Sequence, residues 1–220
     1  MRLYLRTSPS DTIVPFAHLP MVTSALHRWL GPDNPEHDKL SLYSFSWLQG
    51  GRVVKGGLTF AQGAEFFISF YIREPLTRLV QGILADPDLD YGLRVTEVNI
   101  REVPVFAAVT RFQVASPVFI KRDQHDGKDR HILYSDPEAD DCLTATLHHK
   151  LTSAGLDPTG ANVRFDRSYT KAKTQLILYK NLQNKASFCP VIVSGTPEQV
   201  AFTWCVGVGN STGIGFGSLI

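Results

Sequence analysis

The chain has 220 residues, of which 43% are hydrophobic and 20% charged, a composition typical of a folded protein with one large or two small domains. The formal net charge of +1 excludes a chain-wide basic surface, so any nucleic-acid site must come from local clustering of charge. No apolar run is long enough to span a membrane, the segment "MRLYLRTSPS" is not a secretory signal, and three cysteines without paired spacing indicate reduced thiols, so we expect a cytoplasmic protein that does not bind membranes.

The first half of the sequence alternates between strand and helix patterns. Alternating apolar residues predict strands, and amphipathic segments opened by Pro20 and Pro75 predict helices. The predicted order is strand 2–8, helix 20–31, strand 40–48, a short hairpin arm at 49–57, strand 58–70, helix 74–87 and strand 91–103. This β-α-β-β-α-β order predicts a ferredoxin-like unit, in which two helices cover one face of an antiparallel sheet.

The second half repeats this order less clearly. Thr196 and Gln199 form a capping box that opens the last helix, and "GFGSLI" ends the sequence as a predicted strand. The predicted elements are an extended stretch at 105–121, a helix at 138–155, strands at 174–181 and 187–195, a helix at 196–207 and a strand at 215–220. We therefore predict an α+β fold of two tandem ferredoxin-like (βαββαβ, RRM-like) domains, 1–104 and 105–220, with a boundary near Pro104.

The segment "GVGNSTGIGFG" contains five glycines, at positions 207, 209, 213, 215 and 217. A dinucleotide-binding loop must open a helix, and only three residues follow Gly217. A Walker loop needs a lysine, which residues 207–220 lack. Two interpretations remain: glycines that serve tight turns, or bare backbone amides that contact a polyanion.

Basic charge gathers between Arg164 and Lys185, where six basic residues accompany only Asp166. The segment is either a strand edge protected by lysine or a phosphate-binding face, and the nearby glycine loop favours the second interpretation. The sequence lacks the K/R-G-F/Y-G/A-F-V-x-F/Y motif, so the usual RNA-stacking platform is not supported.

These features together carry a family resemblance over essentially the whole chain. The "GVGNSTGIGFG" pattern resembles the glycine-rich loop of the RAMP superfamily, the repeat-associated proteins of CRISPR systems. The "LYSFSWLQG" and "SPVFIK" stretches resemble its endoribonuclease branch, which cuts CRISPR repeat transcripts into guide RNAs. The resemblance implies an endoribonuclease whose partners are the repeat transcript and the guide RNA product, and it leaves contacts with other effector subunits and homodimer formation open.

The resemblance also implies a chemistry. In this family the 2′-hydroxyl attacks the adjacent phosphate without a metal and leaves a 2′,3′-cyclic phosphate and a 5′-hydroxyl. Such a reaction needs a base, an acid and positive charge near the phosphorane, and histidine suits the first two roles. The family often has a catalytic histidine at or just after its first helix, where this chain has His27 and His37, with Lys39 two residues beyond. The alternatives are a surface role for His37 and Lys39 and a half-buried helix-end role for His27.

For RNA binding we predict the basic segment and the glycine loop: Arg164, Arg167, Lys171, Lys173, Gly207, Gly209, Asn210, Ser211, Thr212, Gly213 and Gly215. No H-E-x-x-H or paired C-x-x-C motif occurs, so we expect neither a metal site nor another cofactor. Two other functions stay open: a non-catalytic RAMP-type subunit that holds guide RNA, and a ligand-binding tandem ferredoxin-like protein that does not bind RNA.

Overall fold

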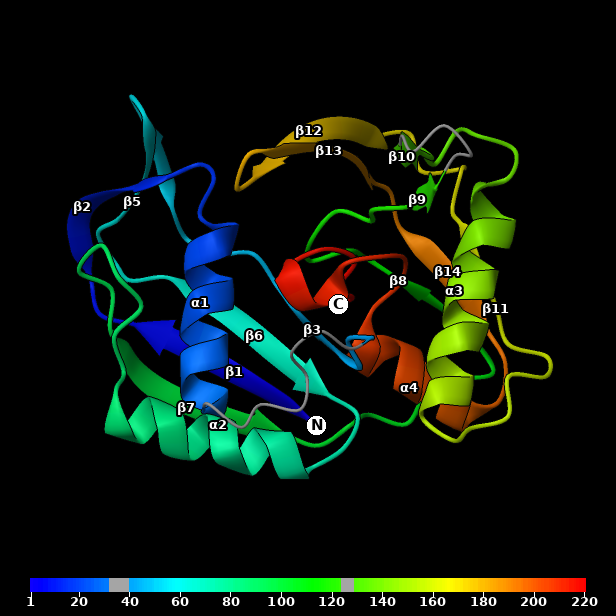
Figure 1. Ribbon diagram of the computed structural model, residues 1–220, viewed down its shortest axis with the longest axis horizontal. Helices are drawn as coiled ribbons and strands as arrows, with labels where there is room; N and C mark the ends of the chain where they lie inside the picture. Colours follow the sequence, from blue (N-terminus) through cyan, green and yellow to red (C-terminus); the bar gives the residue numbers. More distant parts are fainter. Residues whose placement is uncertain (32–39, 124–128) are drawn as a thin grey trace.

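The structure, a computed structural model, describes residues 1–31, 40–123 and 129–220 and confirms the α+β class with antiparallel sheets (Figure 1). Each half of the chain builds one sheet with helices packed on it. We call these halves the N-terminal and the C-terminal unit. The domain boundary near Pro104 stays a prediction. In the described parts of the chain, no helix combines the length and the apolar character needed to cross a membrane.

The N-terminal unit has the ferredoxin-like strand order β3-β6-β1-β7, with every neighbouring pair antiparallel. Its elements are β1 (Arg2–Thr7), α1 (Leu19–Leu30), β3 (Tyr43–Phe45), β6 (Glu65–Phe70), α2 (Glu74–Ala85) and β7 (Val95–Arg101). A separate three-stranded arm consists of β2 (Ser10–Pro15), β5 (Gly57–Phe60) and β4 (Arg52–Val54). The sequence did not predict β2. The single strand predicted at 58–70 was wrong, because the chain turns between β5 and β6 at Gly63, whose φ is +82°.

The C-terminal unit has the sheet order β11-β14-β8. Its sheet strands and helices are β8 (Val109–Phe112), α3 (Ala139–Ser153), β11 (Asn162–Phe165), β14 (Val191–Ser194), α4 (Pro197–Val206) and the short 3-10 helix η1 (Thr212–Ile214). Two hairpins extend from it, β9 (Lys121–Asp123) with β10 (Asp129–His131), and β12 (Lys173–Tyr179) with β13 (Leu182–Phe188).

Two predicted strands of this unit differ in detail. The strand predicted at 187–195 is interrupted, since Pro190 between β13 and β14 has no amide to donate to a ladder. The final strand predicted at 215–220 is reduced to one bridge, Leu219 with Val114. This bridge lies beside β8, where the fourth strand of a ferredoxin-like sheet belongs.

The apolar stripe of α1 is buried, as the sequence predicted, and α1 and α2 cover the same face of the N-terminal sheet (Figure 1). The two helices approach closely at Gly82, where a Cβ atom would lie 2.1 Å from the carbonyl oxygen of Trp29. The Trp29 indole donates to the Asp86 carbonyl at 2.7 Å at the end of α2. On β1, Leu3 and Leu5 point into this core, and the alternate residues Arg2, Tyr4 and Arg6 point to the opposite face of the sheet.

Arg2 on that opposite face joins the two units. Its side chain is fully buried, with the guanidinium 3.8 Å from the ring centre of Phe67 and 3.5 Å from that of Trp204. Nε donates to Ser69 Oγ at 2.6 Å, and Nη2 donates to the carbonyls of Trp204 at 3.2 Å and Leu219 at 2.9 Å. Burial lowers the pKa of Arg2 to about 10, so the group stays charged at neutral pH.

We expect Arg2→Ala to lower the free energy of unfolding by about 2–4 kcal/mol, because it leaves a cavity and removes the donor of two carbonyls between the units. Urea unfolding monitored by circular dichroism measures the change. Arg6→Ala is the matched control: Arg6 lies on the same face of the same strand but is exposed, and its loss should cost less than about 0.5 kcal/mol. Equal costs for the two variants would contradict the role of Arg2.

Candidate nucleic-acid interface

The glycine segment 207–217 lies between the two units, in the red part of the chain at the centre of Figure 1. The five glycines themselves are buried. A Cβ atom at Gly213 would lie 2.2 Å from Ser41 Oγ, and one at Gly215 would lie 2.7 Å from a methyl group of Leu19. These positions need glycine because the N-terminal unit packs directly against the backbone there.

Several amides of this segment donate within the protein. The amide of Val208 donates to the Gly217 carbonyl, and that of Asn210 donates to the Phe119 carbonyl. The amide of Gly217 donates in turn to the Pro117 carbonyl. The burial of the glycines agrees with the turn interpretation, and the predicted contacts of Gly207, Gly209, Gly213 and Gly215 with phosphate stay a prediction.

At the tip of the segment, Asn210 and Ser211 are partly exposed, whereas Thr212 is buried. Asn210 Oδ1 accepts a hydrogen bond from the amide of Lys121 at 3.0 Å. Direct RNA contact by this segment stays a prediction, and Asn210 and Ser211 are the residues placed to make it.

A groove of about 600 Å³ runs along the open face of the N-terminal sheet, where it meets the C-terminal unit. Its wall includes the partly exposed rings of Tyr4, Trp47 and Phe188. The Trp47 and Phe188 rings meet edge to face at 5.5 Å, and the Arg101 guanidinium lies 4.8 Å from the ring centre of Tyr4. Other charged and polar residues of the wall are Arg6, Gln49, Glu65, Glu97 and Asn99.

The motif search on the sequence missed this groove. Aromatic rings beside guanidinium groups suit the stacking of unpaired bases. The signal for it was present in "RLYLRT", whose alternation places Tyr4 and Arg6 on the face opposite Leu3 and Leu5. The opposite wall of the groove could not be predicted from that pattern, because Phe188 belongs to the C-terminal unit.

The structure places Lys171 and Lys173 at the start of the β12–β13 hairpin, at the top of Figure 1. Both are exposed, and Lys173 Nζ lies 5.5 Å from the ring centre of Phe188, which lines the groove. Lys180 and Lys185 are also exposed on this hairpin. Four exposed lysines therefore lie on or beside this hairpin, and Lys173 is the one placed next to the groove.

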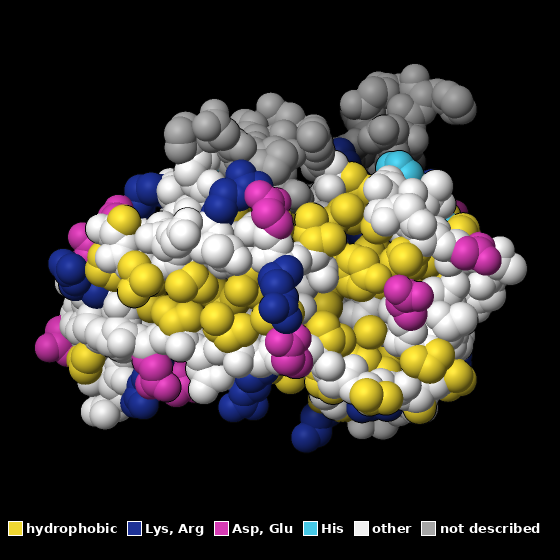
Figure 2. Space-filling view, turned by 90° about the horizontal axis from the view of Figure 1, so that it is seen from below, with side chains coloured by type: hydrophobic (Ala, Val, Ile, Leu, Met, Phe, Trp, Pro, Cys, Tyr) yellow, Lys and Arg dark blue, Asp and Glu magenta, His cyan; other side chains and the backbone are white. Residues whose placement is uncertain are grey.

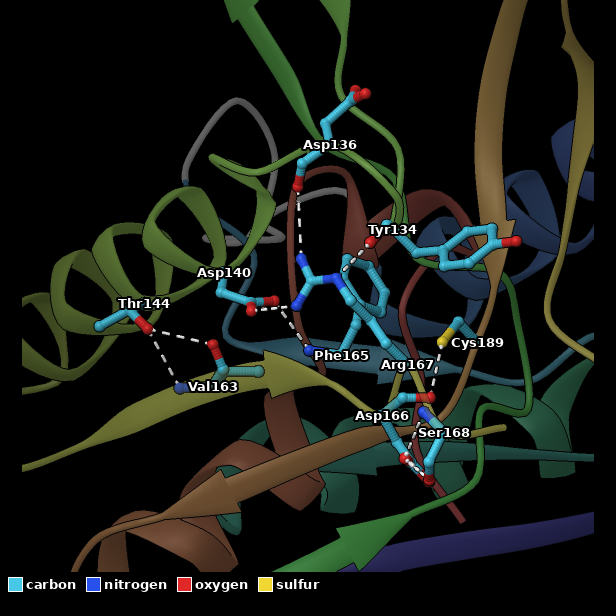
Figure 3. Close-up of polar contacts among 10 residues, drawn as sticks. All are labelled: Tyr134, Asp136, Asp140, Thr144, Val163, Phe165, Asp166, Arg167, Ser168 and Cys189. Carbon is cyan, nitrogen blue, oxygen red and sulfur yellow. Dashed lines mark hydrogen bonds and ion pairs between the residues drawn. The ribbon is translucent and has the colours of Figure 1, made fainter. Parts of the chain in front are cut away.

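The remaining basic residues of the segment lie elsewhere. Arg164 is exposed on β11, paired in register with Ile192. Arg167 is occupied by the protein itself (Figure 3): it forms an ion pair with Asp140 at the start of α3, and it donates to the carbonyls of Tyr134 at 3.0 Å and Asp136 at 3.3 Å. We infer that Arg167 primarily fixes α3 on β11.

Asp166 sits next to this network (Figure 3). Hydrogen bonding by the Ser168 hydroxyl, together with the Arg111 guanidinium at 2.6 Å, lowers the pKa of its carboxyl. The neighbouring Cys189 thiol is buried, which raises its pKa to about 11. A thiol with such a pKa is a poor nucleophile at neutral pH.

Of the three predicted catalytic residues, the structure describes His27. His27 lies in the last turn of α1 and is half-buried. Its neighbour Arg28 is paired with Asp86 at 2.8 Å, so the positive charge next to His27 is partly compensated. His37 and Lys39 fall outside the described residues, and their roles stay predictions. Within residues 1–31, 40–123 and 129–220, no group of three or more His, Cys, Asp or Glu side chains is placed to hold a metal ion.

Figure 2 shows the face seen from below Figure 1, where Lys and Arg side chains are interspersed with Asp and Glu side chains and separated by hydrophobic patches. This mixture agrees with the net charge of +1 and forms no surface of a single sign. The lysine-bearing hairpin lies at the opposite, upper side of the molecule.

The whole chain superimposes on solved structures of Cas6, Cas6-related and RAMP proteins. A Cas6-related protein from Pyrococcus furiosus matches with a TM-score of 0.87 and 18% identity, over 100% of this chain and 97% of that chain. A RAMP protein described as binding different RNA substrates matches with a TM-score of 0.86 and 20% identity, over 100% and 99%. A CRISPR associated protein Cas6 matches with a TM-score of 0.83 and 22% identity, over 100% and 98%. The fold is thus the tandem ferredoxin-like fold of RAMP proteins.

Residues 101–219, more than half of the chain, match the family model described as CRISPR associated protein Cas6, C-terminal. The chain therefore belongs to the Cas6 family, which confirms the resemblance found in the sequence. No curated protein sequence matches the chain.

Proposed function

We propose that this protein is a metal-independent endoribonuclease that binds CRISPR repeat RNA and cuts the precursor transcript into guide RNAs. Its membership of the Cas6 family carries this proposal. The structure supports it with a groove suited to unpaired bases and a neighbouring lysine-rich hairpin suited to phosphates.

In this proposal the RNA backbone follows the β12–β13 hairpin, where Lys171 and Lys173 attract phosphates, and unpaired bases enter the groove beside Tyr4 and Trp47. The lysines give affinity without sequence preference, because they contact only the backbone. The acidic residues Glu65 and Glu97 in the same groove can accept hydrogen bonds from base amino groups and thereby contribute selectivity.

For the chemistry we propose His37 as the base that takes the proton of the 2′-hydroxyl. His27 would protonate the leaving 5′-oxygen, since the C-terminal end of a helix favours the protonated imidazolium. Lys39 would stabilise the charge that develops on the phosphorane. The products would be a 2′,3′-cyclic phosphate and a 5′-hydroxyl, and no step uses a metal-bound water.

A second candidate function is a non-catalytic RNA-binding subunit. One structural neighbour, the RAMP protein described as binding different RNA substrates, favours it, since that description names binding alone. An RNA-cleavage assay distinguishes the two candidate functions, because the endoribonuclease and the non-catalytic subunit would both bind repeat RNA.

We expect the wild-type protein to cut a repeat RNA in excess EDTA and to leave a cyclic phosphate on the 5′ product. His37→Ala should lower the single-turnover rate by about 10²–10⁴-fold, with RNA affinity within about threefold of wild type, because a general base contributes to the reaction more than to binding. Gel analysis of end-labelled RNA gives the rate, and filter binding gives the affinity.

His27→Ala should also slow cleavage, and an unchanged rate would reduce the proposed pair to one histidine. His149→Ala is the matched control, because His149 is an exposed histidine on α3, outside the proposed site. Loss of cutting in EDTA with recovery in magnesium or manganese would contradict the mechanism, and binding without any cutting would favour the non-catalytic subunit.

Replacing Lys171 and Lys173 together by alanine should weaken binding to RNAs of every sequence and reduce the slope of log K against log salt by about 1–2, since two phosphate contacts are lost. Filter binding between low and moderate salt measures the slope. Lys55→Ala in the turn between β4 and β5 is the control with an equally exposed lysine. An unchanged slope in the double variant would remove the hairpin from the RNA path.

A further inference from the structure

Lys150, in the last turn of α3, is a lysine buried in the C-terminal unit. Only 2% of the surface of this residue is exposed to solvent. The ammonium Nζ donates to the carbonyl oxygens of Val206 at 3.2 Å and Gly207 at 3.4 Å, and to Thr212 Oγ1 at 3.1 Å. Burial lowers the pKa of Lys150 to about 7. The side chain turns inward toward the end of α4.

The three acceptors belong to one stretch of chain. Val206 ends α4, Gly207 opens the glycine segment, and Thr212 begins η1 within it. Among the described residues, the ion pairs do not include Lys150. Its burial is therefore compensated by backbone and hydroxyl oxygens of the glycine segment rather than by a carboxylate.

The hydrogen bonds of Lys150 can form in both protonation states of its amine. An ammonium donates to all three oxygens, and a neutral amine can donate to both carbonyls while its lone pair accepts from the Thr212 hydroxyl. Lys150 is therefore a fixed anchor of the glycine segment and not a switch that responds to protonation.

The far side of the same segment rests on the N-terminal unit. The Tyr43 hydroxyl donates to the Gly213 carbonyl at 3.2 Å, and Trp47 Nε1 donates to the Gly215 carbonyl at 2.8 Å. Ser41, against which Gly213 packs, follows the proposed catalytic residue Lys39 by two positions in the chain. The segment thus connects the buried ammonium of one unit to the strand β3 of the other.

We propose that Lys150 is a positioning residue for RNA cleavage: it holds the glycine segment in the shape that supports β3 and Ser41. This inference rests on the proposed nuclease function. Small displacements of catalytic groups reduce rates strongly, so the loss of this anchor should lower the rate of the reaction more than the affinity for RNA.

The test uses Lys150→Met, which keeps the aliphatic stem and removes the donors. The first readout needs no RNA: the indole N–H signals in ¹H–¹⁵N NMR spectra, with Trp47 assigned by Trp47→Phe. We expect the Trp47 signal to shift, because its acceptor Gly215 belongs to the released segment. The Trp29 signal, whose acceptor is Asp86 at the end of α2, should stay in place.

The second readout is cleavage of repeat RNA. We expect the single-turnover rate of Lys150→Met at saturating protein to fall by about 10–100-fold, with the dissociation constant within about threefold of wild type. Lys55→Met, the same change at an exposed lysine, should alter neither the Trp47 signal nor the rate. If Lys150→Met does not fold, Thr212→Val carries the test, since it removes one of the three acceptors, and we expect the same two changes at smaller size.

An unmoved Trp47 signal in a folded variant would overturn the anchor role. A shifted signal with a wild-type rate would overturn the positioning role, because the segment would then move without consequence for cleavage. If the wild-type protein itself does not cut RNA, the proposed function fails and the positioning role fails with it. The indole signals distinguish that outcome from a failure of Lys150 to hold the segment.

Discussion

The close approach of two backbone stretches at the end of the glycine segment is the constraint on which the rest of this structure depends. A Cβ atom at Gly217 would lie 1.9 Å from the Val208 carbonyl oxygen, so only glycine permits the chain to fold back there. The amide of Val208 donates to the Gly217 carbonyl, and the residues that follow run beside β8. The segment thereby fills the space between the units, and Arg2 crosses the same junction from the other side.

The junction between the two units determines the shape of the groove. One wall of the groove comes from the N-terminal sheet, and another comes from Phe188 and Ile220 of the C-terminal unit. The shape of the groove therefore depends on the relative position of the two units. The hairpin that carries Lys173 packs on the N-terminal core through Ile177 and Ala186. A rigid arrangement of basic and aromatic groups reduces the ordering cost of binding a flexible RNA strand, which is how a fold of modest net charge can serve as an RNA-binding surface.

The sequence predicted the helices α1 to α4 and the ferredoxin-like order, because apolar periodicity and local signals such as Pro20 and the Thr196 capping box act within one element. It did not predict the fates of Arg2 and Lys150, which look like ordinary surface positions in their own strand and helix and are buried only by contacts distant in the chain. For the same reason the sequence predicts the basic segment as one surface, although Arg167 forms an ion pair with Asp140 at the start of α3. Tertiary packing determines whether such residues are exposed or buried.

The central claim, that the glycine segment is a buried joint between the two units, is tested most directly by native-state hydrogen exchange in the absence of RNA. The amides of Val208, Asn210 and Gly217 should exchange as slowly as that of Leu3 on β1, because they donate to carbonyls of the protein within a segment whose glycines are buried against the N-terminal unit. Exchange of these three amides as fast as that of the exposed turn at 155–160 would contradict the account.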